Sequence, residues 1–182
     1  LKPDLLDAQR DLILLAADAK DYSEALTIAR SVQKQRPKEA VGFQLEGDIA
    51  ASQRKWDAAA DVYRTGLKQG AVPALAIKLY AALGAAGKTA EQDKFANSWL
   101  ADNPTDAVMR LFLGDRAIAR KNYADAEKFY SSVIRIQPNN AVAYNNLAWV
   151  TGKLNKGGAV GYVEKAIALA PNQPAFMDTL AM

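Results

Sequence analysis

The residues in this chain that could support chemistry are few. The 182 residues include no cysteine and no histidine, so no thiolate nucleophile, imidazole base or usual zinc ligand set can form. The carboxylates of Asp102 and Asp106 could share general acid and base roles. Both stand at predicted exposed helix starts, where the helix dipole favours a carboxylate without any catalytic role.

A second candidate for chemistry is the segment Gly87-Lys88-Thr89, which matches the end of a phosphate-binding loop. That loop needs an earlier glycine where this chain has Ala82, and a strand before it, which the sequence does not predict. The chain also lacks the Gly-x-Ser-x-Gly pattern of a nucleophile elbow. We therefore expect no catalysis, no cofactor and no metal site.

Asn145 and Trp149 are better suited to binding than to catalysis. They lie four positions apart, so they share one face of a predicted helix. The Asn145 amide could donate to and accept from the backbone of an extended ligand, and the Trp149 ring could anchor an apolar group. The alternative is that Trp149 packs against the preceding first helix near Leu111.

These residues lie within a series of amphipathic helical hairpins. The clearest hairpin runs from Ala107 to Pro138, where apolar and small residues recur about every 3.6 positions on both sides of a turn at 120–122. A hairpin of this size cannot bury its apolar face alone, so its neighbours must repeat it. The sequence predicts such neighbours at a period of about 34 residues.

Four prolines mark this period along the chain, and each of them follows a predicted helix. Pro104 comes two periods after Pro37, and Pro138 and Pro171 follow at one period each, all to within a single position. We expect ten helices in five hairpins and an eleventh that is cut short. The predicted repeats span residues 5–37, 40–71, 73–104, 107–138, 141–171 and, in part, 174–182.

The spacing within these hairpins resembles the tetratricopeptide repeat (TPR) over essentially the whole chain. The matching residues of the fourth hairpin are Arg110, Leu113, Gly114, Ala117, Ala126, Tyr130, Val133 and Pro138. The resemblance implies an all-α fold, a solenoid of antiparallel helix pairs wound into a right-handed superhelix. We expect one TPR array over residues 1–182, cut from a longer protein.

Small residues at family positions allow the two helices of a hairpin to approach closely. Gly47 with Ala59, and Gly114 with Ala126, fulfil this role. The third hairpin departs from the pattern, since Tyr80, Gln92 and Trp99 replace small residues. We expect that pair of helices to open, repack or twist, and to lie farther apart than the pair containing Gly114.

A narrower resemblance covers the C-terminal repeats. The segments Ser98 to Pro104, Tyr144 to Trp149, Ala168 to Asn172 and Asp178 to Leu180 resemble TPR lipoproteins of bacterial exosortase (PEP-CTERM) exopolysaccharide systems. The resemblance implies a lipid anchor on the full protein, which would be a periplasmic or outer-membrane lipoprotein that faces the periplasm. The segment itself has no strongly apolar run longer than Leu12 to Ala17, so we expect no direct membrane insertion.

Stacked hairpins place mainly their first helices on a concave wall that suits a peptide or protein segment. The candidate binding residues on that wall are Gln44, Asp48, Ile77, Leu111, Asp115, Ile118, Asn145 and Trp149, with Arg10, Leu14, Ala81 and Asp178 completing the series. We expect Ile77, Leu111 and Ile118 to be partly buried. Few of these residues are cationic, so a carboxylate clamp of the kind found in chaperone-binding relatives is not expected.

The function predicted from these features is a non-catalytic scaffold that binds a protein or peptide. The alternative is binding of an envelope polysaccharide or another polymer, which more aromatic residues on the wall would favour. Net charge is +3 and the basic residues are dispersed, so no nucleic-acid partner is expected. The short segment 174–182 should dock on the fifth hairpin, and its bare face predicts a monomer or weak dimer.

Overall fold

The structure is a computed structural model that describes residues 5–180, and eleven helices and no strand occur among them. The helices are α1 (Leu6–Asp18), α2 (Tyr22–Gln35), α3 (Val41–Ser52), α4 (Trp56–Leu67), α5 (Pro73–Ala85), α6 (Thr89–Asp102), α7 (Ala107–Ala119), α8 (Tyr123–Ile136), α9 (Ala141–Lys153), α10 (Ala159–Leu169) and α11 (Pro174–Leu180). Helix accounts for 77% of the described residues. The predicted five hairpins and the eleventh helix after them are confirmed.

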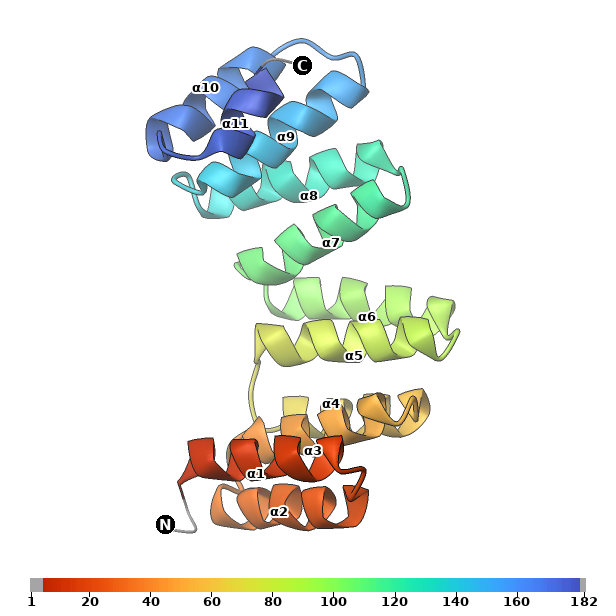
Figure 1. Cartoon of the computed structure of the whole chain (residues 1–182). Helices are drawn as coiled ribbons and strands as arrows, with labels where there is room; N and C mark the ends of the chain where they lie inside the picture. Colours follow the sequence, from red (N-terminus) through yellow and green to blue (C-terminus); the bar gives the residue numbers. More distant parts are fainter. Residues whose placement is uncertain (1–4, 181–182) are drawn as a thin grey trace. The chain divides into compact units, whose positions relative to one another are not determined.

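The chain divides into two compact units (Figure 1). Unit 1 is Leu1–Asn103 and contains α1 to α6, and unit 2 is Pro104–Met182 and contains α7 to α11. Within each unit, consecutive helices pack side by side as antiparallel neighbours. The prediction of one continuous array across both units stays a prediction.

Each of the five hairpins turns through a residue with left-handed backbone. These residues are Lys20, Arg54, Gly87, Lys121 and Asn155, with φ between 53° and 75°, and they recur at almost equal intervals along the chain. The next residue donates its N–H to a carbonyl five positions back, as Asp21 does to Ala16 at 2.8 Å. This bond offsets the strain of about 1–2 kcal/mol that a left-handed conformation costs a residue with a side chain.

Helix starts carry polar caps where the sequence supplies them. Asp21, Asp106, Asn122 and Asn140 each accept a hydrogen bond from the backbone N–H three positions later, at 2.9 to 3.3 Å. α5 instead begins with Pro73, whose missing N–H would have no helical partner at that position. Local sequence therefore marks the start of five hairpin helices, whereas α1, α3, α4, α6 and α10 begin without a side-chain cap.

Glycine at the centre of two hairpins makes room for a tyrosine from the partner helix. A Cβ at Gly47 would lie 2.2 Å from Cε1 of Tyr63, and a Cβ at Gly114 would lie 2.6 Å from Cε1 of Tyr130. Both rings are buried, Tyr130 completely. The predicted role of the small residues is confirmed, and the structure adds that the glycine gap is filled by a ring.

The third hairpin reverses this arrangement of sizes. Tyr80 of α5 occupies the position equivalent to Gly47, and the facing position on α6 is Ala96 in place of a tyrosine; both are buried. Gln92 of α6 likewise faces Gly84, and its Nε2 donates to the Tyr80 carbonyl at 2.8 Å. In this hairpin the large side chain is therefore on the first helix and the small one on the second. α5 and α6 pack against each other less extensively than α7 and α8 do.

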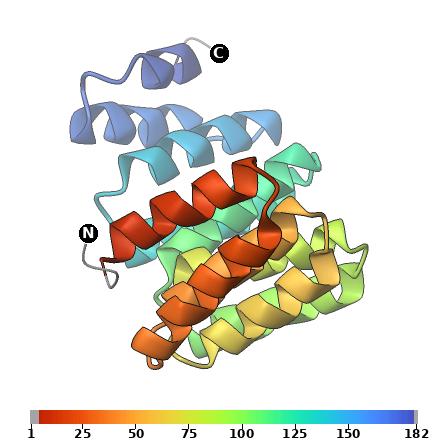
Figure 2. The same cartoon turned by 60° about the horizontal axis from the view of Figure 1, so that its bottom comes forward.

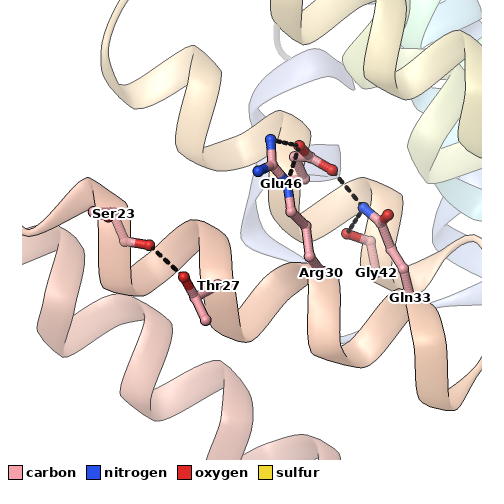
Figure 3. Close-up of polar contacts among 6 residues, drawn as sticks. All are labelled: Ser23, Thr27, Arg30, Gln33, Gly42 and Glu46. Atoms are coloured by element: carbon pink, nitrogen blue, oxygen red, sulfur yellow. Dashed lines mark hydrogen bonds and ion pairs between the residues drawn. The ribbon is translucent and has the colours of Figure 1, made fainter.

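Hairpins within unit 1 are also joined by polar contacts, which Figure 3 shows between α2 and α3. Arg30 donates through Nε and Nη2 to Oε1 of Glu46 at 3.0 and 2.9 Å. Gln33 donates to the other oxygen of Glu46 at 2.5 Å and to the Gly42 carbonyl at 3.3 Å. These bonds fix the register of the second hairpin on the first.

In unit 2, α11 lies beside α10 (Figure 2). Phe176 is buried and packs with Ala148, Val163 and Ala166, which confirms the predicted docking on the fifth hairpin. Met177 and Leu180 remain exposed. Ala181 and Met182 belong to the predicted partial repeat but lie outside the described residues.

Candidate functional site

The candidate residues of unit 1 fall into a shallow depression and a polar cluster. Arg10 and Gln44 line an open depression of about 350 Å³, between α1, α3 and the loops at 38–40 and 69–72. Asp48 and Ile77 are half-buried farther along the first helices. Leu14 and Ala81 are exposed, and Arg10 also forms an ion pair with Asp7 at 3.4 Å.

The carboxylate of Asp48 is held by residues from two neighbouring helices. The hydroxyl of Tyr63, on α4, donates to Oδ1 of Asp48 at 2.7 Å. The ammonium of Lys78, on α5, donates to the same oxygen at 2.7 Å. Asp48 is therefore both oriented and neutralised within the chain.

Unit 2 repeats this arrangement with one change. The hydroxyl of Tyr130, on α8, donates to Oδ1 of Asp115 at 2.6 Å. The residue on the next first helix is Asn146, whose amide donates to the same oxygen at 3.4 Å. Among the described residues, no lysine or arginine forms an ion pair with Asp115, and its side chain is exposed.

The two tyrosines of these clusters are protonated over an unusually wide pH range. Burial, together with the hydrogen bond to Asp48, raises the pKa of Tyr63, and burial with the hydrogen bond to Asp115 raises the pKa of Tyr130. The main causes are the same because each buried hydroxyl donates to an aspartate of the partner helix.

This shift predicts a loss of stability at high pH. Above about pH 10 the unfolded chain loses these protons while the folded chain keeps them, so the free energy of unfolding should fall by at most about 1.4 kcal/mol per pH unit for each tyrosine. Urea unfolding from pH 8 to 11.5 should show a flatter profile for Tyr63→Phe/Tyr130→Phe than for the unaltered chain. Parallel profiles would contradict this account.

Asn145 and Trp149 occupy one face of α9, as predicted. Oδ1 of Asn145 is buried without a hydrogen-bond partner among the described residues, and its Nδ2 donates only a long bond of 3.4 Å to Asn146. The ring of Trp149 is half-buried, meets Tyr123 edge-on with centroids 5.8 Å apart, and has Lys153 Nζ 5.0 Å from its centroid. Because this oxygen is buried, a ligand cannot reach it in this orientation of the side chain.

Trp149 also forms one wall of a cavity of about 220 Å³ in unit 2. The lining is mainly apolar and comes from α9, α10 and α11: Ala148, Trp149, Gly152, Lys153, Ala159, Val160, Val163, Thr179 and Leu180. Trp149 therefore contributes both to the core of unit 2 and to the lining of this cavity. Asp178, the last residue of the predicted series, is exposed on α11.

The three aliphatic candidates are partly buried, as expected. Leu111 and Ile118 pack against the core that contains Ala117, Tyr130 and Leu147. Trp149 packs on the same core, which agrees with the packing interpretation of this ring, and its contact with a ligand stays a prediction.

The residues considered for catalysis have structural partners. Asp106 caps α7 through the Met109 N–H at 3.0 Å, and Asp102 accepts a bond of 3.5 Å from Ser98. Lys88 pairs with Asp57 at 2.6 Å, and this hydrogen bond raises the pKa of the Lys88 ammonium. Its charge is directed at a carboxylate in unit 1.

Two further observations bear on ligands and membranes. Over residues 5–180, no three acidic, cysteine or histidine side chains gather closely enough to hold a metal ion. In the same range, no helix combines the length and apolar character that crossing a membrane requires.

Sequence reasoning missed the groups that orient the carboxylates. Tyr130 was expected only as a residue of the repeat pattern, and no polar role was predicted for Tyr63, Lys78, Asn146 or Lys153. A signal was present, because Gly-Asp recurs at 47–48 and 114–115 with a tyrosine fifteen positions after each aspartate.

The antiparallel helix pairs give this chain the fold of a TPR solenoid. No family model matches it, and no curated protein matches its sequence. It is similar in structure to YrrB, described as a TPR protein with an unusual peptide-binding site, with a TM-score of 0.60 and 16% identity over 96% of this chain and 91% of that one.

Structures of MamA are similar to the chain as well. One has a TM-score of 0.60 and 18% identity over 86% of this chain and 92% of that one. Another, from Desulfovibrio magneticus RS-1, has a TM-score of 0.58 and 14% identity over 92% and 96% of the two chains. The TM-scores show a shared fold, and at identities this low the comparisons show the fold alone.

Proposed function

We propose that this chain is a non-catalytic TPR scaffold that binds an extended peptide or protein segment on the surface formed by its first helices. The observation that carries the proposal is the row on unit 2 formed by Asp115, Asn145 and Trp149. It offers an exposed carboxylate on α7 and, on the first helix of the next hairpin, a half-buried amide and a half-buried ring. The peptide-binding site named for YrrB, a protein of the same fold, supports the same kind of ligand.

A peptide fits this row better than a sugar polymer does. Polysaccharide sites use several aromatic faces, and among the predicted wall residues only Trp149 is aromatic. An extended backbone instead supplies N–H groups at regular spacing, and the exposed carboxylate of Asp115 is an acceptor for them.

Selection of peptides tests the function. A displayed library of random dodecapeptides is selected on the purified chain, and the affinity of each synthetic hit is measured by fluorescence anisotropy. Hits should lose affinity on Asn145→Ala/Trp149→Ala and keep it on Glu164→Ala/Lys165→Ala, which alters an exposed part of α10. If no peptide is selected while purified exopolysaccharide binds, the polymer alternative replaces the proposal.

The cellular setting we propose is the bacterial envelope, in exopolysaccharide or protein-sorting assembly associated with an exosortase system. Its support is the sequence resemblance of the segments at 98–104, 144–149, 168–172 and 178–180. The location that accompanies it is the periplasm, through a lipid anchor on the full protein. Fractionation of the source cells, with an antibody to this segment, should recover the protein with envelope membranes; recovery in the cytosol would contradict the proposal.

A further inference from the structure

The two aspartate clusters differ in one residue, and that difference points to the ligand. In each cluster, a tyrosine ring packs against a glycine of the first helix. Its hydroxyl donates a hydrogen bond to the aspartate that follows this glycine, Asp48 or Asp115. Each carboxylate is therefore held in a fixed position on the surface of a first helix. Such orientation lowers the cost of binding a further donor.

Unit 1 shows which group this arrangement accepts. The ammonium of Lys78 lies 2.7 Å from Oδ1 of Asp48, with the Tyr63 hydroxyl at 2.7 Å from the same atom. A lysine of the next hairpin thus acts as an internal occupant of the cluster. The bond joins opposite charges, which makes it stronger than a neutral hydrogen bond.

Unit 2 lacks this occupant. Asn146 takes the place of Lys78 and forms only a 3.4 Å bond to Oδ1 of Asp115. Oδ2 of Asp115 has no hydrogen bond among the described residues, and the side chain is exposed. An ionised carboxylate can accept about four hydrogen bonds, so Asp115 has capacity for a cation from outside.

We infer that Asp115 receives a lysine or arginine side chain of the bound segment, which takes the place that Lys78 takes on Asp48. This inference rests on the peptide-binding function proposed above and names the chemistry of its ligand: a segment with a cationic residue that reaches Asp115 while a neighbouring apolar residue lies against Trp149. Charge complementarity selects this ligand over an acidic one, because a carboxylate of the ligand would be repelled by Asp115.

The first test supplies the missing occupant from within the chain. Asn146→Lys places an ammonium beside Asp115 as Lys78 does beside Asp48, and it should weaken the selected dodecapeptides about tenfold. Gln137→Lys adds the same charge at an exposed position on unit 2 and should leave affinity within about twofold. Equal losses in both variants would show a general charge effect and overturn the inference.

The second test pairs each variant with an altered peptide. Replacing the cationic residue of a selected peptide by glutamine should lower its affinity about tenfold on the unaltered chain and hardly at all on Asp115→Asn. This variant keeps the size of the side chain and an acceptor for the Tyr130 hydroxyl. Asp48→Asn, whose cluster is already occupied, should behave as the unaltered chain does. Circular dichroism checks that each variant is folded.

The outcomes separate the two proposals. The inference is overturned if the selected peptides bind without a lysine or arginine. It is also overturned if the glutamine replacement reduces affinity as much on Asp115→Asn as on the unaltered chain. Either result leaves the peptide-binding function in place. Failure of the library to yield any peptide overturns both.

Discussion

Gly114→Ala should lower the free energy of unfolding by about 2–3 kcal/mol, although alanine is the better helix former by about 1 kcal/mol. The added methyl would lie 2.6 Å from Cε1 and 2.7 Å from Cζ of Tyr130. The ring cannot withdraw easily, because it is completely buried and its hydroxyl is bonded to Asp115 at 2.6 Å. Urea unfolding followed by circular dichroism measures the loss.

Gly161→Ala is the matched control for this prediction. Gly161 lies within α10 of the same unit, and a Cβ there would meet nothing within 4 Å. The substitution should therefore stabilise the chain by about 0.5–1 kcal/mol through helix propensity alone. Tyr130→Leu, combined with Gly114→Ala, should recover part of the loss relative to the sum of the single changes. If the Gly114→Ala variant is as stable as the unaltered chain, the Tyr130 ring does not depend on the space left by Gly114.

Trp149→Ala should have the largest effect on binding, a loss of about thirtyfold or more for the selected peptides, which corresponds to about 2 kcal/mol. Its effect on unfolding should be smaller, about 1–2 kcal/mol, because the half-buried ring keeps one side free of the core that contains Tyr130. Anisotropy titration and urea unfolding on the same preparation measure the two effects.

The control for this prediction is Trp56→Ala in α4, which removes another half-buried tryptophan. It should change stability by a similar amount and leave peptide affinity unchanged, since Trp56 lies on the second helix of its hairpin. If Trp149→Ala lowers the free energy of unfolding by about 3 kcal/mol or more and leaves peptide affinity unchanged, Trp149 is a core residue alone.

The architecture was predictable because its signals are local and periodic. Apolar spacing near the helical period and the shared phase of Pro37, Pro104, Pro138 and Pro171 predicted the helices of the structure. The turns were harder to read. Lys20, Arg54 and Lys121 adopt left-handed backbone although lysine and arginine do not favour it, because the hydrogen bond that closes each turn offsets the strain.

The site was only partly predictable, because its decisive contacts join residues from different helices. Asp115, Asn145 and Trp149 were placed on one surface by helical spacing. The bond from Tyr130 to Asp115 depends on a ring crossing the gap left by Gly114, which no single position reveals. The third hairpin shows the same limit: Tyr80 was compared with family positions alone, whereas its fit depends on Ala96 opposite.

The pairing of Gly-Asp with a distant tyrosine has a consequence for how such an array could grow. It occurs in the second and fourth hairpins, two repeats apart, and is absent from the first, third and fifth. The backbone thus repeats at one hairpin, but the side-chain pattern repeats at two. Gene duplication of a single hairpin would disrupt this alternation, whereas duplication of a hairpin pair preserves it, so the two-hairpin segment is the natural unit for lengthening or recombining this chain.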